Sequence, residues 1–246
     1  MRGKFIVFEG GEGSGKTTQI KSLHQWLEAE IKTNETLKLL PTKDNFKGVK
    51  LTREPGGTPI GKQIRQLLLT PPDLSTASIA SKTELLLYAA DRAQHVEETL
   101  IPWLEAGYWV LCDRYTDSTV AYQGYGRQLD LALIHQLNQI ATGELKSDLT
   151  LWLNVSPTVG LARMHQRGQA DRIEQAGSSF HQRVGDGFAA LAQPTATGSP
   201  QPLSSGPTIE IAGDRPIETV AAEIQQVLRQ KIDQWFFKSL KQREQP

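Results

Sequence analysis

A glycine-rich segment near the start of the chain constrains the fold more than any other feature. It runs from Gly10 to Thr17, reads Gly-Gly-Glu-Gly-Ser-Gly-Lys-Thr, and fits the pattern G-x-x-x-x-G-K-[ST] in full. An apolar run over residues 5–8 precedes it and a helical pattern follows it. This is the strand, loop and helix order that the pattern requires, and it argues against a glycine-rich turn that holds no ligand.

The chemistry of this segment is phosphate binding. Glycines let backbone N–H groups point at phosphate oxygens, and the helix that follows adds the positive end of its dipole. Lys16 would reach the β- and γ-phosphates, and the Thr17 hydroxyl would bind Mg²⁺. We therefore expect a nucleoside triphosphate site formed by Gly10, Gly11, Gly13, Ser14, Gly15, Lys16 and Thr17.

Length and charge narrow the class further. The chain has 246 residues and no linker that would separate two cores, so we expect one domain. Its 27 basic and 27 acidic residues cancel, which gives no support for a nucleic-acid or membrane-surface partner. A single cysteine, Cys112, excludes an intramolecular disulfide. With no apolar stretch of transmembrane length, these features predict a cytoplasmic protein.

Apolar runs alternate with helical patterns along the chain. Strands are expected over residues 4–9, 49–52, 108–113, 149–155 and 208–212, with helices between them. This alternation predicts an α/β fold, a parallel sheet with helices on both faces. A long helix over residues 78–106 should bend at Pro102. Residues 33–47 and the Pro- and Ser-rich residues 194–207 have the composition of insertions, the second one disordered or on the surface.

Polar side chains follow two of the expected strands. Asp113 and Arg114 end the strand over residues 108–113, and Arg53 follows the strand over residues 49–52. Ligands bind beyond the carboxyl ends of strands in open α/β sheets. Asp113 would hold Mg²⁺ directly or through water, and Arg114 would bind a phosphate through two N–H groups. The alternative is a surface Asp–Arg pair.

Two further segments suit a phosphotransferase. Tyr88 and Arg92 lie one turn apart on a helix, where a ring and a guanidinium can form a base pocket. Their spacing alone favours the alternative, a core Tyr88 and a solvated Arg92. A charged loop with Arg167 and Arg172 lies between two helical patterns, and we interpret residues 165–177 as a lid over the nucleotide rather than a solvated connector.

Taken in order, these segments resemble the thymidylate kinases. The resemblance rests on Phe8-Glu9-Gly10 with the phosphate loop, Thr52-Arg53-Glu54-Pro55-Gly56-Gly57-Thr58, Leu87-Tyr88-Ala89-Ala90-Asp91-Arg92, Asp113-Arg114-Tyr115 with Ser118, Ala121-Tyr122-Gln123-Gly124 and Asp171-Arg172-Ile173-Glu174. It implies the P-loop NTPase fold: one nucleoside-monophosphate-kinase-like domain over residues 1–246, with a five-stranded parallel sheet and a mobile lid. It also implies transfer of the γ-phosphoryl group of ATP to dTMP with Mg²⁺, for dTTP synthesis, by a homodimer packed through residues 78–106.

The resemblance assigns a role to each matched residue. Thr18 would help to hold the α-phosphate, and Glu12 would lie near the acceptor sugar. Arg53 and Arg114 would hold the dTMP phosphate. Tyr88 would stack on thymine and Arg92 would donate to its O4. The residues that would line the deoxyribose and base are Ser118, Tyr122 and Gln123.

The residues of the phosphate loop indicate which type of thymidylate kinase the chain resembles. None of residues 11–14 is basic, so the cation that some members carry in the loop is missing here. The transferring phosphoryl group spreads negative charge over its oxygens and needs a cation besides Lys16. The resemblance then implies the bacterial arrangement, in which lid arginines, here Arg167 and Arg172, supply it. Two alternatives remain at this stage, a kinase for another nucleoside or nucleotide and a nucleotide-dependent switch or ATPase.

Overall fold

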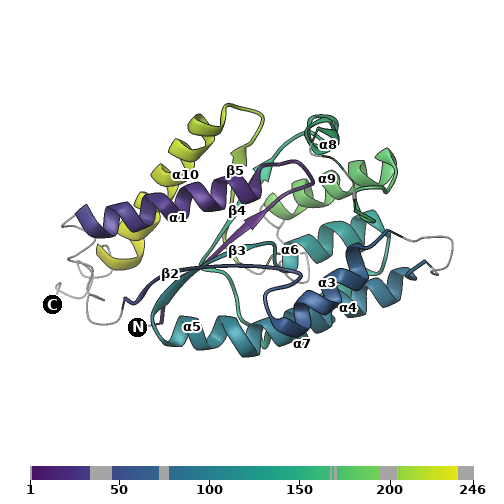
Figure 1. Cartoon of the computed structure of the whole chain (residues 1–246), viewed down its shortest axis with the longest axis horizontal. Helices are drawn as coiled ribbons and strands as arrows, with labels where there is room; N and C mark the ends of the chain where they lie inside the picture. Colours follow the sequence, from purple (N-terminus) through teal and green to yellow (C-terminus); the bar gives the residue numbers. More distant parts are fainter. Residues whose placement is uncertain are drawn as a thin grey trace.

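Five strands form one fully parallel sheet (Figure 1). The computed structural model describes residues 2–33, 46–71, 78–166, 168, 171–193, 204 and 206–237. The strand order is β2-β3-β1-β4-β5. The bounds are Phe5–Glu9 for β1, Gly48–Arg53 for β2, Tyr108–Asp113 for β3, Leu149–Asn154 for β4 and Thr208–Ala212 for β5. The predicted α/β fold and its five-stranded parallel sheet are confirmed.

The register brings the functional strand ends to one edge of the sheet. Phe8 of β1 pairs with Asp113 of β3, and Asp113 also pairs with Arg53 of β2. Glu9, at the end of β1, pairs with Trp152 of β4 on the other side. Because all strands run the same way, the phosphate loop, Arg53 and Arg114 leave the sheet at the same edge.

Helices cover both faces of the sheet (Figure 1). On one face lie α1 (Lys16–Thr33) and α10 (Ile217–Ile232), which continues into the π-helical turn η3 (Asp233–Phe237). The other elements are α3 (Pro59–Leu69), α4 (Ser81–His95), η1 (Val96–Leu100), α5 (Ile101–Glu105), α6 (Thr116–Thr119), η2 (Val120–Gly126), α7 (Leu131–Thr142), α8 (Pro157–His165) and α9 (Ser178–Ala192). Alternate residues of β1 serve the two faces: Ile6 and Phe8 pack in the cluster with α1 and α10, whereas Phe5 and Val7 pack with η1 and α5.

The expected long helix over residues 78–106 is interrupted. It consists of α4, the π-helical turn η1 and α5, and Pro102 lies at the start of α5. Proline has no N–H to donate to the preceding turn. The irregularity therefore lies directly before Pro102, in a widened turn that the sequence pattern does not predict.

Parts of the predicted insertions and of the lid lie outside the described residues. These are residues 34–45, residues 194–203 and 205, and in the lid Arg167 and residues 169–170. Across the described part of the chain, no helix combines the length and the apolar character needed to span a membrane.

Candidate active site

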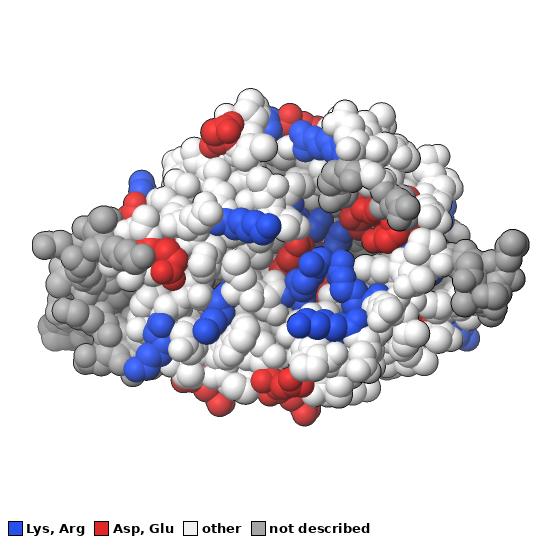
Figure 2. Space-filling model, viewed as in Figure 1, with Lys and Arg blue, Asp and Glu red and all other residues white. Residues whose placement is uncertain are grey.

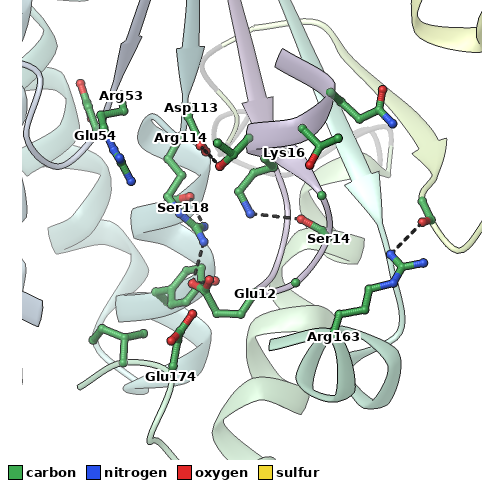
Figure 3. Close-up of a pocket in the computed structure, with 18 of the residues that line it drawn as sticks. Glu12, Ser14, Lys16, Arg53, Glu54, Asp113, Arg114, Ser118, Arg163 and Glu174 are labelled. Carbon is green, nitrogen blue, oxygen red and sulfur yellow. Dashed lines mark hydrogen bonds and ion pairs between the residues drawn. The ribbon is translucent and has the colours of Figure 1, made fainter. Parts of the chain in front are cut away.

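A cavity of about 840 Å³ opens at the carboxyl edge of the sheet. Its lining comes from the phosphate loop, the ends of β2 and β3, α4, η2 and the turn after β5. Basic side chains gather around a hollow on this face (Figure 2). The close-up in Figure 3 shows Lys16, Arg53 and Arg114 reaching toward it from three different elements. Most of the predicted site residues line this one cavity, namely Glu12, Gly13, Ser14, Gly15, Lys16, Thr17, Thr18, Arg53, Tyr88, Arg92, Asp113, Arg114, Ser118, Tyr122 and Gln123.

The phosphate loop needs glycine at Gly13. Its φ is 68°, in the left-handed region that glycine favours, and a Cβ there would lie 2.1 Å from the backbone oxygen of Gly160. The loop wraps around the Lys16 ammonium, which donates to the carbonyl oxygens of Gly10 at 2.9 Å and Gly11 at 2.8 Å. Gly10 and Gly11 thus hold the lysine but do not line the cavity.

The Lys16 ammonium is buried close to a second cation, Arg114. Burial, and then the neighbouring Arg114 guanidinium, lower the pKa of Lys16 from 10.5 to about 8. An anion placed beside this ammonium would favour its charged form. The site is therefore suited to a polyphosphate.

Thr17 and Asp113 offer oxygens suited to Mg²⁺. The Thr17 hydroxyl donates to Asp113 Oδ2 at 3.0 Å, while the buried Asp113 Oδ1 has no hydrogen-bond partner among the described residues. Hydroxyl and carboxylate oxygens fit this cation, which keeps several water ligands and binds phosphate oxygens too. No group of three or more His, Cys, Asp or Glu residues that could hold a metal occurs in the described ranges.

Arg114 joins the phosphate loop to the opposite wall of the cavity. Its Nη2 donates to Glu12 Oε1 at 2.6 Å, and the Tyr122 hydroxyl donates to the same oxygen at 2.8 Å. The Arg114 guanidinium also lies 4.9 Å from the centre of the Tyr122 ring. Burial by itself raises the pKa of Glu12, but Arg114 and Lys16 outweigh it and lower this pKa to about 2. Glu12 is thus an ionised anchor for Arg114.

Glu9 fixes the turn that carries Arg114, a role that the sequence analysis missed. Glu9 Oε1 accepts from the backbone N–H groups of Tyr115 at 2.8 Å and Ser118 at 3.1 Å, and Oε2 accepts from the Ser118 hydroxyl at 2.5 Å. The Ser118 hydroxyl also accepts from Arg114 at 3.1 Å. Burial and then the Asp117 charge raise the pKa of Glu9 to about 8. The only signal in the sequence was its place in the Phe8-Glu9-Gly10 segment.

Arg92 is deeply buried, so the interpretation of this residue as a solvated side chain is wrong. Its guanidinium donates to Glu54 at 2.8 Å, Thr119 at 2.9 Å, Asn138 at 2.7 Å and the Tyr115 carbonyl at 2.8 Å. These bonds use four of the five N–H donors of a guanidinium and leave one, on Nη2. Arg92 also lines the cavity.

A polar network behind Arg92 fixes the loop after β2. Glu54 Oε1 lies 2.9 Å from His95 Nδ1, and His95 Nε2 lies 2.6 Å from the Thr52 hydroxyl. Asp91 accepts from the backbone N–H of Gly56 at 2.9 Å. Helix α4 thereby holds the loop that directly follows Arg53. The sequence analysis gave no role to Glu54, Asp91 and His95, because their partners lie on other elements.

The structure does not bring Arg172 to the phosphate end of the cavity. Arg172 Nη2 forms an ion pair with Glu84 at 2.7 Å, and its Nε donates to the Leu68 carbonyl at 2.6 Å. Its neighbours Asp171, Ile173 and Glu174 line the cavity instead. The reason is its ion pair with the buried Glu84 carboxylate. The charged composition of the loop does not indicate this distant partner. Arg167 lies outside the described residues.

Three arginines that the sequence analysis left out also line the cavity. Arg163, at the end of α8, donates to the Gly213 carbonyl at 3.1 Å (Figure 3). Arg215 belongs to the turn after β5, and Arg65 of α3 donates to the Pro55 carbonyl at 3.0 Å. The rule that ligands bind beyond strand ends, applied to β5 as well, would have indicated Arg215.

Comparisons with known proteins agree on one family. The family model described as Thymidylate kinase matches residues 8–198. The thymidylate kinase of Cyanothece sp. is 53% identical over 243 residues, covering 96% of this chain and 97% of that protein. That of Acaryochloris marina is 49% identical over 241 residues, covering 96% and 100%. A crystal structure of thymidylate kinase from Ehrlichia chaffeensis matches with a TM-score of 0.62 at 31% identity, covering 93% of this chain and 100% of that one.

Proposed function

The chain belongs to the thymidylate kinase family, whose members phosphorylate dTMP to dTDP with ATP, and we propose how the residues of its cavity carry out this reaction. One observation carries the proposal: the phosphate loop and the predicted base pocket line the same cavity, joined by the Glu12–Arg114 pair. The family assignment supports neither of the two alternatives, a kinase for another nucleoside or nucleotide and a nucleotide-dependent switch or ATPase.

The donor end holds ATP. Backbone N–H groups of residues 13–18 would surround the phosphates, with Lys16 at the β- and γ-phosphates and Thr18 at the α-phosphate. Mg²⁺ would be held by Thr17 and Asp113, where it would neutralise negative charge on the phosphate oxygens. Arg163 and Arg215 lie where the cavity continues toward the turn after β5, which leaves room there for the nucleoside of ATP.

The acceptor end holds dTMP. Arg53 and Arg114 would bind its phosphate, and Tyr88 would stack on thymine. The remaining N–H of Arg92 would donate to thymine O4. Tyr122 and Gln123 would line the deoxyribose and the base. The Ser118 hydroxyl already bonds Glu9 and Arg114, so its contribution would be to place Arg114.

Transfer needs no protein nucleophile. A phosphate oxygen of dTMP would attack the γ-phosphorus of ATP in line, while the bond from that phosphorus to the oxygen shared with the β-phosphate breaks and ADP leaves. Catalysis would consist of positioning and charge stabilisation. Lys16 and Arg114 supply positive charge on the two sides of the reacting groups, and Glu12 holds Arg114 in place. Arg167 is proposed as the lid cation. Arg172, bound to Glu84, could supply this charge only after leaving that ion pair.

A homodimer is proposed through the outer face of α3, α4 and α7. Five large apolar side chains on these helices are exposed: Ile60, Leu67, Leu86, Leu133 and Ile140. Helix α4 packs between α3 and α7, so they belong to one layer of the fold. A second copy would cover this apolar surface. A cytoplasmic location is proposed with it, because the enzyme draws on ATP.

Product analysis across a Mg²⁺ titration tests the proposal. Wild-type protein with ATP and dTMP should form dTDP only when Mg²⁺ is present. Asp113→Asn should need a higher Mg²⁺ concentration for half-maximal rate. Asp148→Asn is the control, since Asp148 pairs with Arg2 and Lys4 and does not line the cavity. Identical Mg²⁺ dependence in the wild type and Asp113→Asn would contradict the assigned metal site.

A further inference from the structure

A buried carboxylate beside the base end of the cavity joins two other parts of the chain. Glu84, in the first turn of α4, is fully buried. Its Oε1 accepts from Gln123 Nε2 at 2.9 Å and from Arg127 Nε at 3.1 Å. Its Oε2 accepts from Arg127 Nη2 at 3.0 Å and pairs with Arg172 Nη2 at 2.7 Å. The cluster thus connects α4 to η2, with the residue directly after it, and to the lid segment that carries Arg172.

Two guanidinium groups keep Glu84 ionised. Burial by itself raises the pKa of Glu84, but hydrogen bonds from Arg127 and Gln123, and the positive charge of Arg127, outweigh it, so that this pKa is lowered. The Arg172 guanidinium, in an ion pair with Glu84, acts in the same direction. Glu84 therefore acts as an acceptor only.

Because the Glu84 carboxylate can only accept hydrogen bonds, it fixes the orientation of the Gln123 amide. Only the NH₂ group of the amide can face an ionised carboxylate, because the amide oxygen donates no hydrogen bond. The amide oxygen must then point away from Glu84. Gln123 lines the cavity, and among the described residues nothing donates to this oxygen. Gln123 therefore presents an acceptor to the ligand.

This acceptor complements the one free donor of Arg92. Thymine carries an N–H donor at N3 beside the acceptor O4, whereas cytosine carries an acceptor at N3 beside an amino donor. An acceptor from Gln123 and a donor from Arg92 match the first pattern and oppose the second. Reversal of the Gln123 amide would place its NH₂ where thymine N3–H lies and would lose this selectivity.

We propose that Glu84 is a positioning residue that sets base selectivity by holding the Gln123 amide as an acceptor, and that Arg172 acts through Glu84 rather than on the transferring phosphate. The inference rests on the proposed function, in which Gln123 lines the base site. Arg172 also anchors its own segment, since its backbone N–H donates to the Leu69 carbonyl at 3.0 Å and its Nε to that of Leu68. The packing of the Arg172 segment against the end of α3 is therefore coupled to base selectivity.

Two variants and a matched pair of acceptors test the inference. Glu84→Gln can present either a donor or an acceptor to Gln123, so the amide is no longer held in one orientation. Arg172→Ala removes the ion pair but leaves Arg127 on Glu84, which keeps a measurable variant if Glu84→Gln folds poorly. The acceptors are dTMP and 5-methyl-dCMP, which differ only at N3 and position 4. Arg229→Ala is the control, since it removes an ion pair with Glu30 far from the base site.

The readout is the ratio of kcat/KM for dTMP to kcat/KM for 5-methyl-dCMP. We expect this ratio to fall about tenfold in Glu84→Gln, less in Arg172→Ala, and not at all in Arg229→Ala. KM for ATP should stay unchanged. An equal loss of kcat with both acceptors in Arg172→Ala, at an unchanged ratio, would overturn the inference and restore Arg172 as a phosphate ligand. Absence of dTMP phosphorylation in the wild type would instead refute the proposed function.

Discussion

Replacing Arg92 by alanine should destabilise the fold before it reports on base recognition. Arg92 and Glu54 are 2% and 3% exposed and form an ion pair at 2.8 Å. Removal of one member of a buried pair leaves an uncompensated charge, at a cost of about 3–5 kcal/mol. The lost partner of the buried Asn138 carbonyl adds about 1 kcal/mol. His95 remains beside Glu54 and offsets part of this cost.

The net loss should be about 4 kcal/mol. A domain of this size is stable by roughly 5–15 kcal/mol, so the variant should fold but unfold at a markedly lower urea concentration. With about 2–4 °C of Tm for each kcal/mol, the thermal midpoint should fall by about 8–16 °C. Any loss of dTMP selectivity in this variant would then be mixed with a loss of folded protein.

Urea unfolding followed by circular dichroism, with m-values compared, measures the effect. The control is Arg229→Ala, whose ion pair with Glu30 is largely exposed on the arginine side and should contribute under about 1 kcal/mol. Arg92→Ala within about 1 kcal/mol of the wild type would refute the description of Arg92 as the centre of a buried network.

Three further predictions follow from single residues. Gly13→Ala should lower kcat/KM for ATP at least about tenfold, because its Cβ would lie 2.1 Å from the Gly160 oxygen. Gly11→Ala is the control, since a Cβ there meets nothing within 4 Å and its effect should be milder. Equal kcat/KM for ATP in the two variants would contradict the close contact at Gly13. Burial raises the pKa of Glu9 from 4.5 to about 8, so the folded state binds the proton more tightly, and the resulting stability is present in full below pH 4.5 and lost as pH rises through 8. The unfolding free energy of Glu9→Gln should therefore fall less than that of the wild type between pH 5.5 and 8. An equal fall of the unfolding free energy in the two proteins over this pH range would contradict the raised pKa of Glu9. Ile140→Glu changes a side chain that is 77% exposed, so it should not disturb the fold of the single chain. Light scattering should then report a monomer. A dimer in this variant would remove α7 from the proposed interface.

The sequence predicted what depends on backbone pattern and local chemistry. All five strands follow from apolar runs, and the strand-end rule placed Arg53, Asp113 and Arg114 at one edge. The phosphate loop was recognisable because its glycines and Lys16 have a fixed spacing that the chemistry of phosphate requires. These signals are local, so one chain was sufficient to find them.

What the sequence could not predict depends on distant partners. Arg172 binds Glu84, which lies 88 positions earlier, and no spacing rule indicates such a pair. Arg92 was favoured on spacing as a solvated residue, yet Glu54, Thr119 and Asn138 enclose it. Buried polar residues resemble surface ones in sequence, because only the fold shows which of them are paired.

ADP release from Mg²⁺–ATP in the presence of dTMP, dCMP, AMP or no acceptor tests the central claim most directly, with Lys16→Met measured beside the wild type. The account predicts release that depends strongly on dTMP in the wild type and is abolished for every acceptor in Lys16→Met, because the proposal places that ammonium, which lines the cavity, at the transferring phosphate. Release that is the same with and without dTMP, or that persists in Lys16→Met, would contradict it.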